Sequence, residues 1–196
     1  MLPARDAELV QIADAATADA ARRAGAWLKC APGCTQCCVG VFAISQLDAV
    51  RLRQGLVALA ATDPARAEVV QQRAWSAVER LRSSFPGDAG TGILDEETDG
   101  FEDFANNEPC PVLDPATGLC ELYAARPMTC RVFGPPLRTP EGLGVCELCF
   151  EGATADEIAA CEMHLEADAL EASLNEEAEQ AAGVQGNTIV AWALAR

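Results

Sequence analysis

The sequence is poor in aromatic residues, contains one histidine and has no long apolar run. Ten aromatic side chains among 196 residues leave a thin hydrophobic core, so we expect a bound metal to contribute to folding. The single histidine, His164, excludes a catalytic zinc held by three imidazoles. No apolar run approaches the roughly 18 residues that a membrane span requires. We therefore expect a protein without a membrane-spanning segment.

The N-terminal segment lacks the apolar stretch of an export signal. Charged residues are spread from Arg5 to Arg23, and no hydrophobic region interrupts them before Lys29. We therefore expect a cytoplasmic protein. In that reducing compartment, clustered thiols are more often metal ligands or catalytic groups than disulfides.

Positive charge is scarce in the C-terminal part of the chain. Residues 1–82 carry a net charge of +2, residues 83–196 carry −18, and residues 139–195 include no Lys or Arg. Such a surface repels phosphate backbones, so we expect no nucleic-acid ligand. It attracts cations or a basic protein partner, or it is a solvated acidic face that keeps the protein soluble.

Cysteine is the residue that the sequence has in excess. The first four of ten cysteines lie within nine residues, in the pattern C-x3-C-x2-C-C: Cys30, Cys34, Cys37 and Cys38. Such short gaps let thiolates converge on one ion through a turn, whereas near-adjacent cysteines seldom form an unstrained disulfide. Cys110, Cys120 and Cys130 follow at intervals of ten residues in a segment rich in proline and glycine. We predict that the two groups meet within a few ångströms in one metal centre.

The remaining potential ligands are three thiols and the imidazole: Cys146, Cys149, Cys161 and His164. The two-residue gap between Cys146 and Cys149 is typical of metal knuckles and also of redox dithiols. On a predicted helix, Cys161 and His164 share a face with Glu157 and Asp168. The four ligands suit a tetrahedral zinc. Alternatively, Cys161 is a small buried hydrophobic residue and His164 a surface residue.

The pattern of apolar residues predicts a mainly α fold, with residues 1–196 as a single helical domain around an irregular cysteine-rich centre. Helices are expected at about 4–28, 45–60, 64–83 and 155–181 around the loop-rich stretch 109–150. Capping signals start three of them, at Ser45, at Asp63-Pro64 and at Thr154. At most a short β-hairpin is expected, turning at residues 114–118. The acidic, glycine-rich stretch 86–108 is predicted to be a mobile loop.

Four motifs resemble those of a known family. They are Cys30-Ala-Pro-Gly-Cys34-Thr-Gln-Cys37-Cys38, Cys110-Pro-Val-Leu, Gly118-Leu-Cys120-Glu-Leu-Tyr123 and Arg126-Pro127-Met-Thr-Cys130-Arg131. Their order, spacing and flanking residues, over residues 30–133, are similar to those of the YkgJ-like zinc- or iron-chelating cysteine-cluster family, described by its CxxCxxCC motif. The first gap departs from that motif, with three residues rather than two. The flagellin lysine N-methylases carry a similar cluster, but they are larger, so their activity is not carried over.

The metal follows less directly from the residues. All-thiolate sites suit zinc or an iron–sulfur cluster. The first two cysteine groups supply more thiolates than one zinc can use, and an iron–sulfur cluster such as [4Fe–4S] uses four as well. We favour the cluster because its sulfides also accept hydrogen bonds from the glycine-rich backbone and from groups such as Arg131. Arg126 and Arg131 flank Cys130, where they would stabilise a net-negative metal–thiolate unit and its hydrogen bonds, or would form structural ion pairs.

The role that we expect is non-enzymatic metal binding, for structure, metal handling or electron transfer. One alternative is an enzyme related to the cluster-bearing methylases, although the sequence has no glycine-rich strand–turn–helix to hold a methyl donor. Another is a thiol redox switch through Cys37 and Cys38, or through Cys146 and Cys149.

Overall fold

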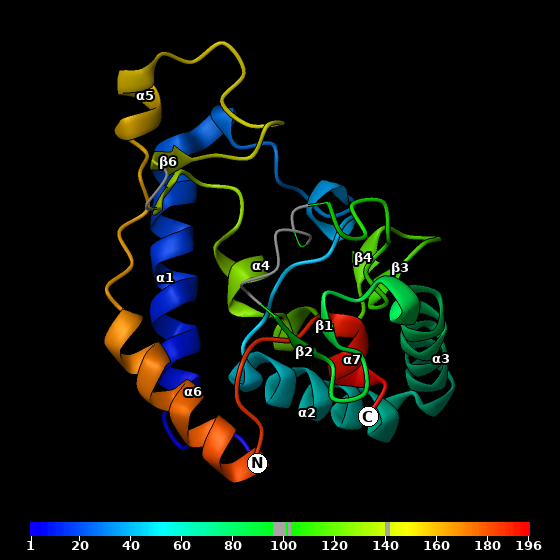
Figure 1. Ribbon diagram of the computed structural model, residues 1–196. Helices are drawn as coiled ribbons and strands as arrows, with labels where there is room; N and C mark the ends of the chain where they lie inside the picture. Colours follow the sequence, from blue (N-terminus) through cyan, green and yellow to red (C-terminus); the bar gives the residue numbers. More distant parts are fainter. Residues whose placement is uncertain (96–100, 102, 140–141) are drawn as a thin grey trace. The chain divides into compact units, whose positions relative to one another are not determined.

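The computed structural model describes residues 1–95, 101, 103–139 and 142–196 (Figure 1). It is mainly α-helical, as predicted. Its contacts divide into two compact units: unit 1 comprises Met1–Pro3, Gly33–Pro127 and Asn175–Arg196, and unit 2 comprises Ala4–Pro32 and Met128–Leu174. Within the described ranges, no helix is both long and apolar enough to cross a membrane.

The described strands form three two-stranded antiparallel hairpins, where the sequence predicted at most one. They are β1 (Gly87–Asp88) with β2 (Ile93–Leu94), β3 (Leu113–Asp114) with β4 (Leu119–Cys120), and β5 (Leu137–Thr139) with β6 (Gly142–Gly144). Strands of two or three residues are too short to show an alternating pattern, so no pattern in the sequence indicated the first and third hairpins.

Unit 1 is built on three helices: α2 (Gln46–Thr62), α3 (Pro64–Leu81) and α7 (Val190–Leu194). The predicted caps are present, since Ser45 Oγ accepts the Asp48 N–H at 3.1 Å and Asp63 Oδ1 accepts the Arg66 N–H at 3.1 Å. Asp63 alone separates α2 from α3, so the two helices form a tight hairpin against which α7 packs (Figure 1).

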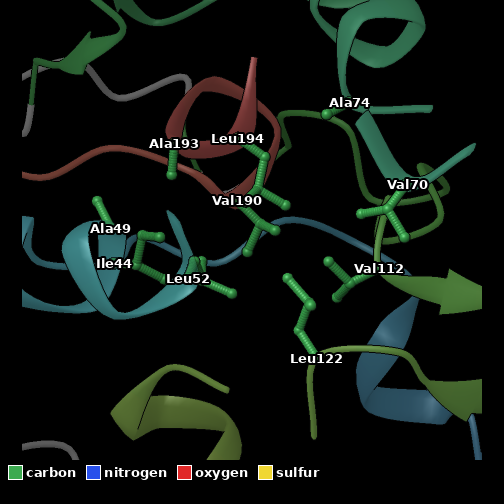
Figure 2. Close-up of a cluster of buried hydrophobic side chains, with 10 residues drawn as sticks. All are labelled: Ile44, Ala49, Leu52, Val70, Ala74, Val112, Leu122, Val190, Ala193 and Leu194. Carbon is green, nitrogen blue, oxygen red and sulfur yellow. The ribbon is translucent and has the colours of Figure 1, made fainter. Parts of the chain in front are cut away.

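Two apolar clusters fill unit 1. The first joins α2, α3 and α7 to the segment that carries Val112 and Leu122, and Figure 2 shows its ten side chains. The second is aromatic: the rings of Phe85 and Trp192 are 4.2 Å apart at their centroids, and Phe104 packs edge-on against Phe85. α3 ends in a 3-10 turn, η3 (Arg82–Ser84), which leads into this second cluster.

The stretch 86–108, predicted to be a mobile loop, contains a short hairpin and a buried aromatic residue among the residues that the structure describes there. β1 pairs with β2, and Phe104 is buried in the aromatic cluster. The apolar residues that stand among the acidic ones explain the difference, because each gains by burial. Gly92, at φ +64°, lies against Trp192, where a Cβ atom would meet the ring at 2.1 Å. Residues 96–100 and 102 lie outside the described part.

Unit 2 is organised by α1 (Asp6–Ala24), which continues into a 3-10 turn, η1 (Gly25–Trp27). The short helix α4 (Met128–Val132) packs against α1. One nitrogen of the Arg131 guanidinium donates to both carboxylate oxygens of Asp14 at 3.0 and 3.1 Å, which fixes this contact.

The single helix predicted for 155–181 is wrong. The structure has α5 (Ala155–Ala159) and α6 (Asp168–Ala182), with a non-helical segment between them. The predicted cap is correct, since Thr154 and Glu157 form a reciprocal capping box. Beyond α5, tertiary bonds replace helical ones: the Met163 N–H donates to Pro136 O at 2.7 Å, and Arg23 donates to the carbonyls of Ala160 and Glu162. Distant partners therefore override helix propensity here.

Candidate metal centre

The ten cysteines are divided equally between the two units. Unit 1 holds Cys34, Cys37, Cys38, Cys110 and Cys120, and unit 2 holds Cys30, Cys130, Cys146, Cys149 and Cys161. The C-x3-C-x2-C-C motif, which the sequence presents as one group, is therefore split between Pro32 and Gly33. All ten cysteines lie in the described part of the chain, and none is in a disulfide.

In unit 1, the double cysteine pairs with the segment that carries Cys110. Cys37 and Cys38 end a 3-10 turn, η2 (Gln36–Cys38), which the Cys38 N–H closes by donating to Thr35 O at 2.8 Å. The Cys110 N–H then donates to Cys38 O at 2.8 Å, and Val39 forms an antiparallel bridge with Pro109. Residues 72 positions apart in the sequence thus become backbone neighbours.

The hairpin β3–β4 adds Cys120 to the same region. It turns at 114–118, as predicted, and places Cys120 opposite Leu113, whose N–H bonds Cys110 O at 3.0 Å. Gly118 takes φ +69°, and a Cβ atom there would lie 3.2 Å from Gly33 Cα. The hairpin tip therefore lies against the loop that carries Cys34. Three segments of unit 1 supply its five thiols.

The surroundings of two of these thiols, Cys37 and Cys120, favour the protonated form. A hydrogen bond with Cys38, followed by burial, raises the pKa of Cys37. Burial raises the pKa of Cys120, and the neighbouring Cys37 thiol adds to this effect, whereas the Leu122 N–H and Arg126 oppose it. A metal that binds here must displace protons, so its affinity will fall as the pH falls.

The two predicted arginines have different surroundings. Arg126 lies in unit 1, where it stacks on Tyr123 with its Cζ 4.0 Å from the ring centroid and lowers the pKa of Cys120. Tyr123 begins a 3-10 turn, η4 (Tyr123–Ala125), directly after the Cys120 hairpin. Arg131 lies in unit 2 and forms the ion pair with Asp14, in agreement with the structural alternative.

Sequence reasoning missed a third arginine, Arg73 on α3. Burial lowers the pKa of Arg73, while the nearby Asp114 and Cys110 oppose that shift. Its guanidinium also donates to Leu113 O at 2.9 Å and pairs with Glu121. It therefore braces the hairpin that carries Cys120 and adds positive charge beside Cys110. No local motif marks Arg73, because its partners lie about 40 residues further along the chain.

In unit 2, three thiols share one apolar cluster. Cys146, Cys149 and Cys161 are 8%, 5% and 5% exposed and pack with Ala24 and Phe150. The Cys149 N–H donates to Cys146 O at 2.8 Å, which closes a turn. Phe150 follows at φ +59°, a left-handed conformation that costs a bulky residue about 1–3 kcal/mol.

The segment after α1 runs beside this turn. The Phe150 N–H donates to Trp27 O at 3.0 Å, and the two rings stack with centroids 6.5 Å apart. The Lys29 N–H donates to Cys149 Sγ at 3.3 Å. Cys30, the next residue, is exposed. Its Sγ lies 2.8 Å from the position that a Cβ atom of Gly134 would take.

Cys130 and His164, the other predicted ligands of unit 2, do not share a helix with Cys161. Cys130 lies on α4, whereas His164 is exposed in the segment between α5 and α6. The predicted face of Cys161 and His164 with Glu157 and Asp168 is therefore wrong, because the helix stops at Ala159.

The donor chemistry fits a metal, but the ligand set stays a prediction. Thiols that the backbone gathers from separate segments are the usual ligands of zinc and of iron–sulfur clusters. Within the described ranges, no group of three or more His, Cys, Asp or Glu side chains is arranged to hold a metal ion. A bound metal would thus require these side chains to rotate.

Comparison with protein families gives one match. Residues 29–150 match the family described as "CxxCxxCC: Putative zinc- or iron-chelating domain". Comparison with curated proteins and with solved structures found no match. The matched segment spans more than half of the chain and includes every cysteine except Cys161. The chain therefore belongs to the CxxCxxCC family of zinc- or iron-chelating domains.

Proposed function

We propose that the protein binds an iron–sulfur cluster, or alternatively zinc, through the cysteines of unit 1. Of the predicted ligands, Cys34, Cys37, Cys38, Cys110 and Cys120 are those that this unit holds. The observation that carries the proposal is the backbone bond from Cys110 to Cys38 beside the hairpin of Cys120. Residues in turns and two-residue strands gain little stability from regular secondary structure. Metal ligation would supply that stability.

The choice of metal follows from the charge around the thiols. Their number does not decide it, since zinc and an iron–sulfur cluster each bind four of the five. Arg126 and Arg73 would offset the negative charge of a metal–thiolate unit, with Arg126 beside Cys120 and Arg73 beside Cys110. When bound, an iron–sulfur cluster supplies one-electron transfer, and charges and hydrogen bonds of this kind set its potential. The protein would then act in electron transfer, metal handling or structure. The net negative charge of residues 83–196 favours a basic protein partner.

A thiol redox switch is the second candidate. It is supported by the hydrogen bond between the Cys37 and Cys38 thiols. Adjacent thiols in contact can be oxidised to a strained, easily reduced disulfide. This candidate predicts protein that is purified with titratable thiols and little metal.

Anaerobic purification followed by metal analysis tests the proposal. We expect brown protein with iron, sulfide and absorption at about 400 nm. Cys120→Ser should lose the iron, whereas Cys161→Ser, a matched change in unit 2, should keep it. Colourless protein with stoichiometric zinc that depends on Cys120 would select zinc. Protein without metal, or iron that survives Cys120→Ser, contradicts the proposed centre.

A further inference from the structure

We propose that unit 2 binds a zinc ion of its own through Cys30, Cys146, Cys149 and Cys161. This site goes beyond the centre proposed for unit 1, since it uses none of the same thiols. Buried cysteines often behave only as small hydrophobic residues. Three features of the backbone around these thiols point instead to ligation.

The first feature is the turn at Cys146 and Cys149. The hydrogen bond between their backbone groups, 2.8 Å long, brings both residues to one apolar cluster, as in a metal knuckle. The chain then leaves the turn through Phe150 in a left-handed conformation, which β-carbon-bearing residues rarely adopt.

The second feature is a backbone donor directed at sulfur. The Lys29 N–H lies 3.3 Å from Cys149 Sγ. Backbone N–H groups that donate to sulfur orient the ligands of metal–thiolate sites. The same segment continues into Cys30, the residue after Lys29.

The third feature is the end of the helix before Cys161. Residues 160–167 contain no proline or glycine, yet they leave the helical path after α5. The Cys161 N–H closes the last turn on Ile158 O at 3.0 Å, and the side chain enters the cluster of Cys146 and Cys149. The bonds of this segment to Arg23 and Pro136, which replace helical ones, thus deliver a third thiol to the cluster.

Cys30, rather than His164, is the fourth ligand. His164 is exposed, and its segment is held by the bond from the Met163 N–H to Pro136 O and by the Thr17 hydroxyl, 3.4 Å from Met163 Sδ. Cys30 instead follows the residue that contacts Cys149 Sγ. Gly134 leaves room for Cys30 Sγ, since a side chain there would collide with it. The described thiols do not stand at coordination distance, so binding requires their rotation toward one point.

Zinc content and zinc X-ray absorption of the purified protein test this site. We expect a zinc ion with four sulfur neighbours at about 2.3 Å. Cys30→Ser, Cys146→Ser and Cys161→Ser should each lose this zinc. His164→Ala and Cys130→Ser, which alter the other two candidate ligands of unit 2, should retain it. Cys120→Ser should also retain it while the unit 1 centre is lost, so the two proposals can fail separately.

A variant that preserves ligation separates metal loss from misfolding. Cys161→His should keep the zinc but change its shell to three sulfurs and one nitrogen. The assignment of Cys30 is overturned if the zinc of the unaltered protein has a nitrogen neighbour. In that case His164→Ala should lose the zinc and Cys30→Ser should keep it. Absence of a zinc that depends on Cys146 and Cys161, or an unchanged four-sulfur shell in Cys161→His, overturns the site.

Discussion

The two units differ in what fills their interiors. Unit 1 buries ten residues in one cluster and nine in another, and none of these is a cysteine. Its thiols Cys110 and Cys120 are only half-buried and pack at the edge of the first cluster. In unit 2, the cluster at the end of α1 has five buried residues, of which three are cysteines. Apolar burial can therefore hold the two clusters of unit 1 together without thiols, whereas the cluster at the end of α1 is built largely on them.

The free energies support this contrast. A fully buried Leu, Val or Phe contributes about 1.5–3 kcal/mol, and unit 1 has many such residues. α1 instead buries mainly alanine, at Ala13, Ala20 and Ala24, which removes little apolar area from water. A structural zinc can add about 10–16 kcal/mol of apparent binding free energy, far more than the small side chains around it.

Metal removal should show the largest difference between the units. We expect a chelator to abolish amide protection at 146–161 in unit 2 and to loosen 109–123 in unit 1, while α2 and α3 stay protected. The reason is that ligation is coupled to folding only where apolar burial is small. Hydrogen exchange read by mass spectrometry measures this. Simultaneous loss of protection in α2, α3 and 146–161 would contradict the contrast.

A core substitution in unit 1 should have the opposite pattern. Leu52 is fully buried on α2, so Leu52→Ala should lower the free energy of unfolding of unit 1 by about 2–5 kcal/mol. Val57 lies on the same helix but is 71% exposed, so Val57→Ala should change the free energy of unfolding by less than about 0.5 kcal/mol. Denaturant unfolding measures both. The zinc content attributed to unit 2 should be equal in the two variants, and a loss confined to Leu52→Ala would show that the units depend on each other.

Local signals in the sequence predicted much of the fold. The caps at Ser45, Asp63 and Thr154 are where the sequence places them, because a cap involves residues within one turn. The α2–α3 hairpin and the turn at 114–118 were predicted for the same reason.

The errors arose where distant contacts decide the structure. The helix break after Ala159 depends on Arg23 and Pro136, which lie more than 20 residues away in the sequence. The division of the first cysteine motif at Gly33 depends on the partners of each half: Cys38 bonds Cys110, whereas Lys29 bonds Cys149. Spacing alone presents the four cysteines as one group, and it does not indicate that Cys30 and Cys34 fall in different units.

A glycine on α2 offers a smaller test of unit 1. Gly→Ala in a helix usually stabilises by about 1 kcal/mol. At Gly55 the new Cβ atom would lie 2.4 Å from Ala125 Cβ, in the η4 turn that follows the Cys120 hairpin. Gly55→Ala should therefore destabilise unit 1 by about 1–3 kcal/mol, because overpacking outweighs the helix preference.

The double variant Gly55→Ala/Ala125→Gly is the control for this clash. It removes the opposing methyl group, so most of the loss should be recovered in a double-mutant cycle measured by denaturant unfolding. Additive losses would show that the contact between α2 and η4 is not responsible.

The smallest expected effects compare matched helix caps in the two units. Ser45→Ala and Thr154→Ala each remove a hydroxyl that accepts a backbone N–H, at a cost of about 1 kcal/mol. Ser45→Ala should appear in the unfolding of all of unit 1, since α2 contacts α3 and α7. Thr154→Ala should raise exchange only in α5 and at Cys161, because α5 is five residues long and precedes a non-helical segment.

The capping box of α5 also predicts a pH dependence. The Thr154 N–H and then its hydroxyl hold the pKa of Glu157 below its usual value of 4.5. A depressed carboxyl pKa stabilises the folded form above the unfolded pKa, and this contribution is lost as the pH falls through the folded pKa. Exchange in α5, corrected for its intrinsic rate, should therefore increase below about pH 4.5 in the unaltered protein and depend less on pH in Glu157→Gln. Equal pH dependence in Glu157→Gln and in the unaltered protein would refute the assignment.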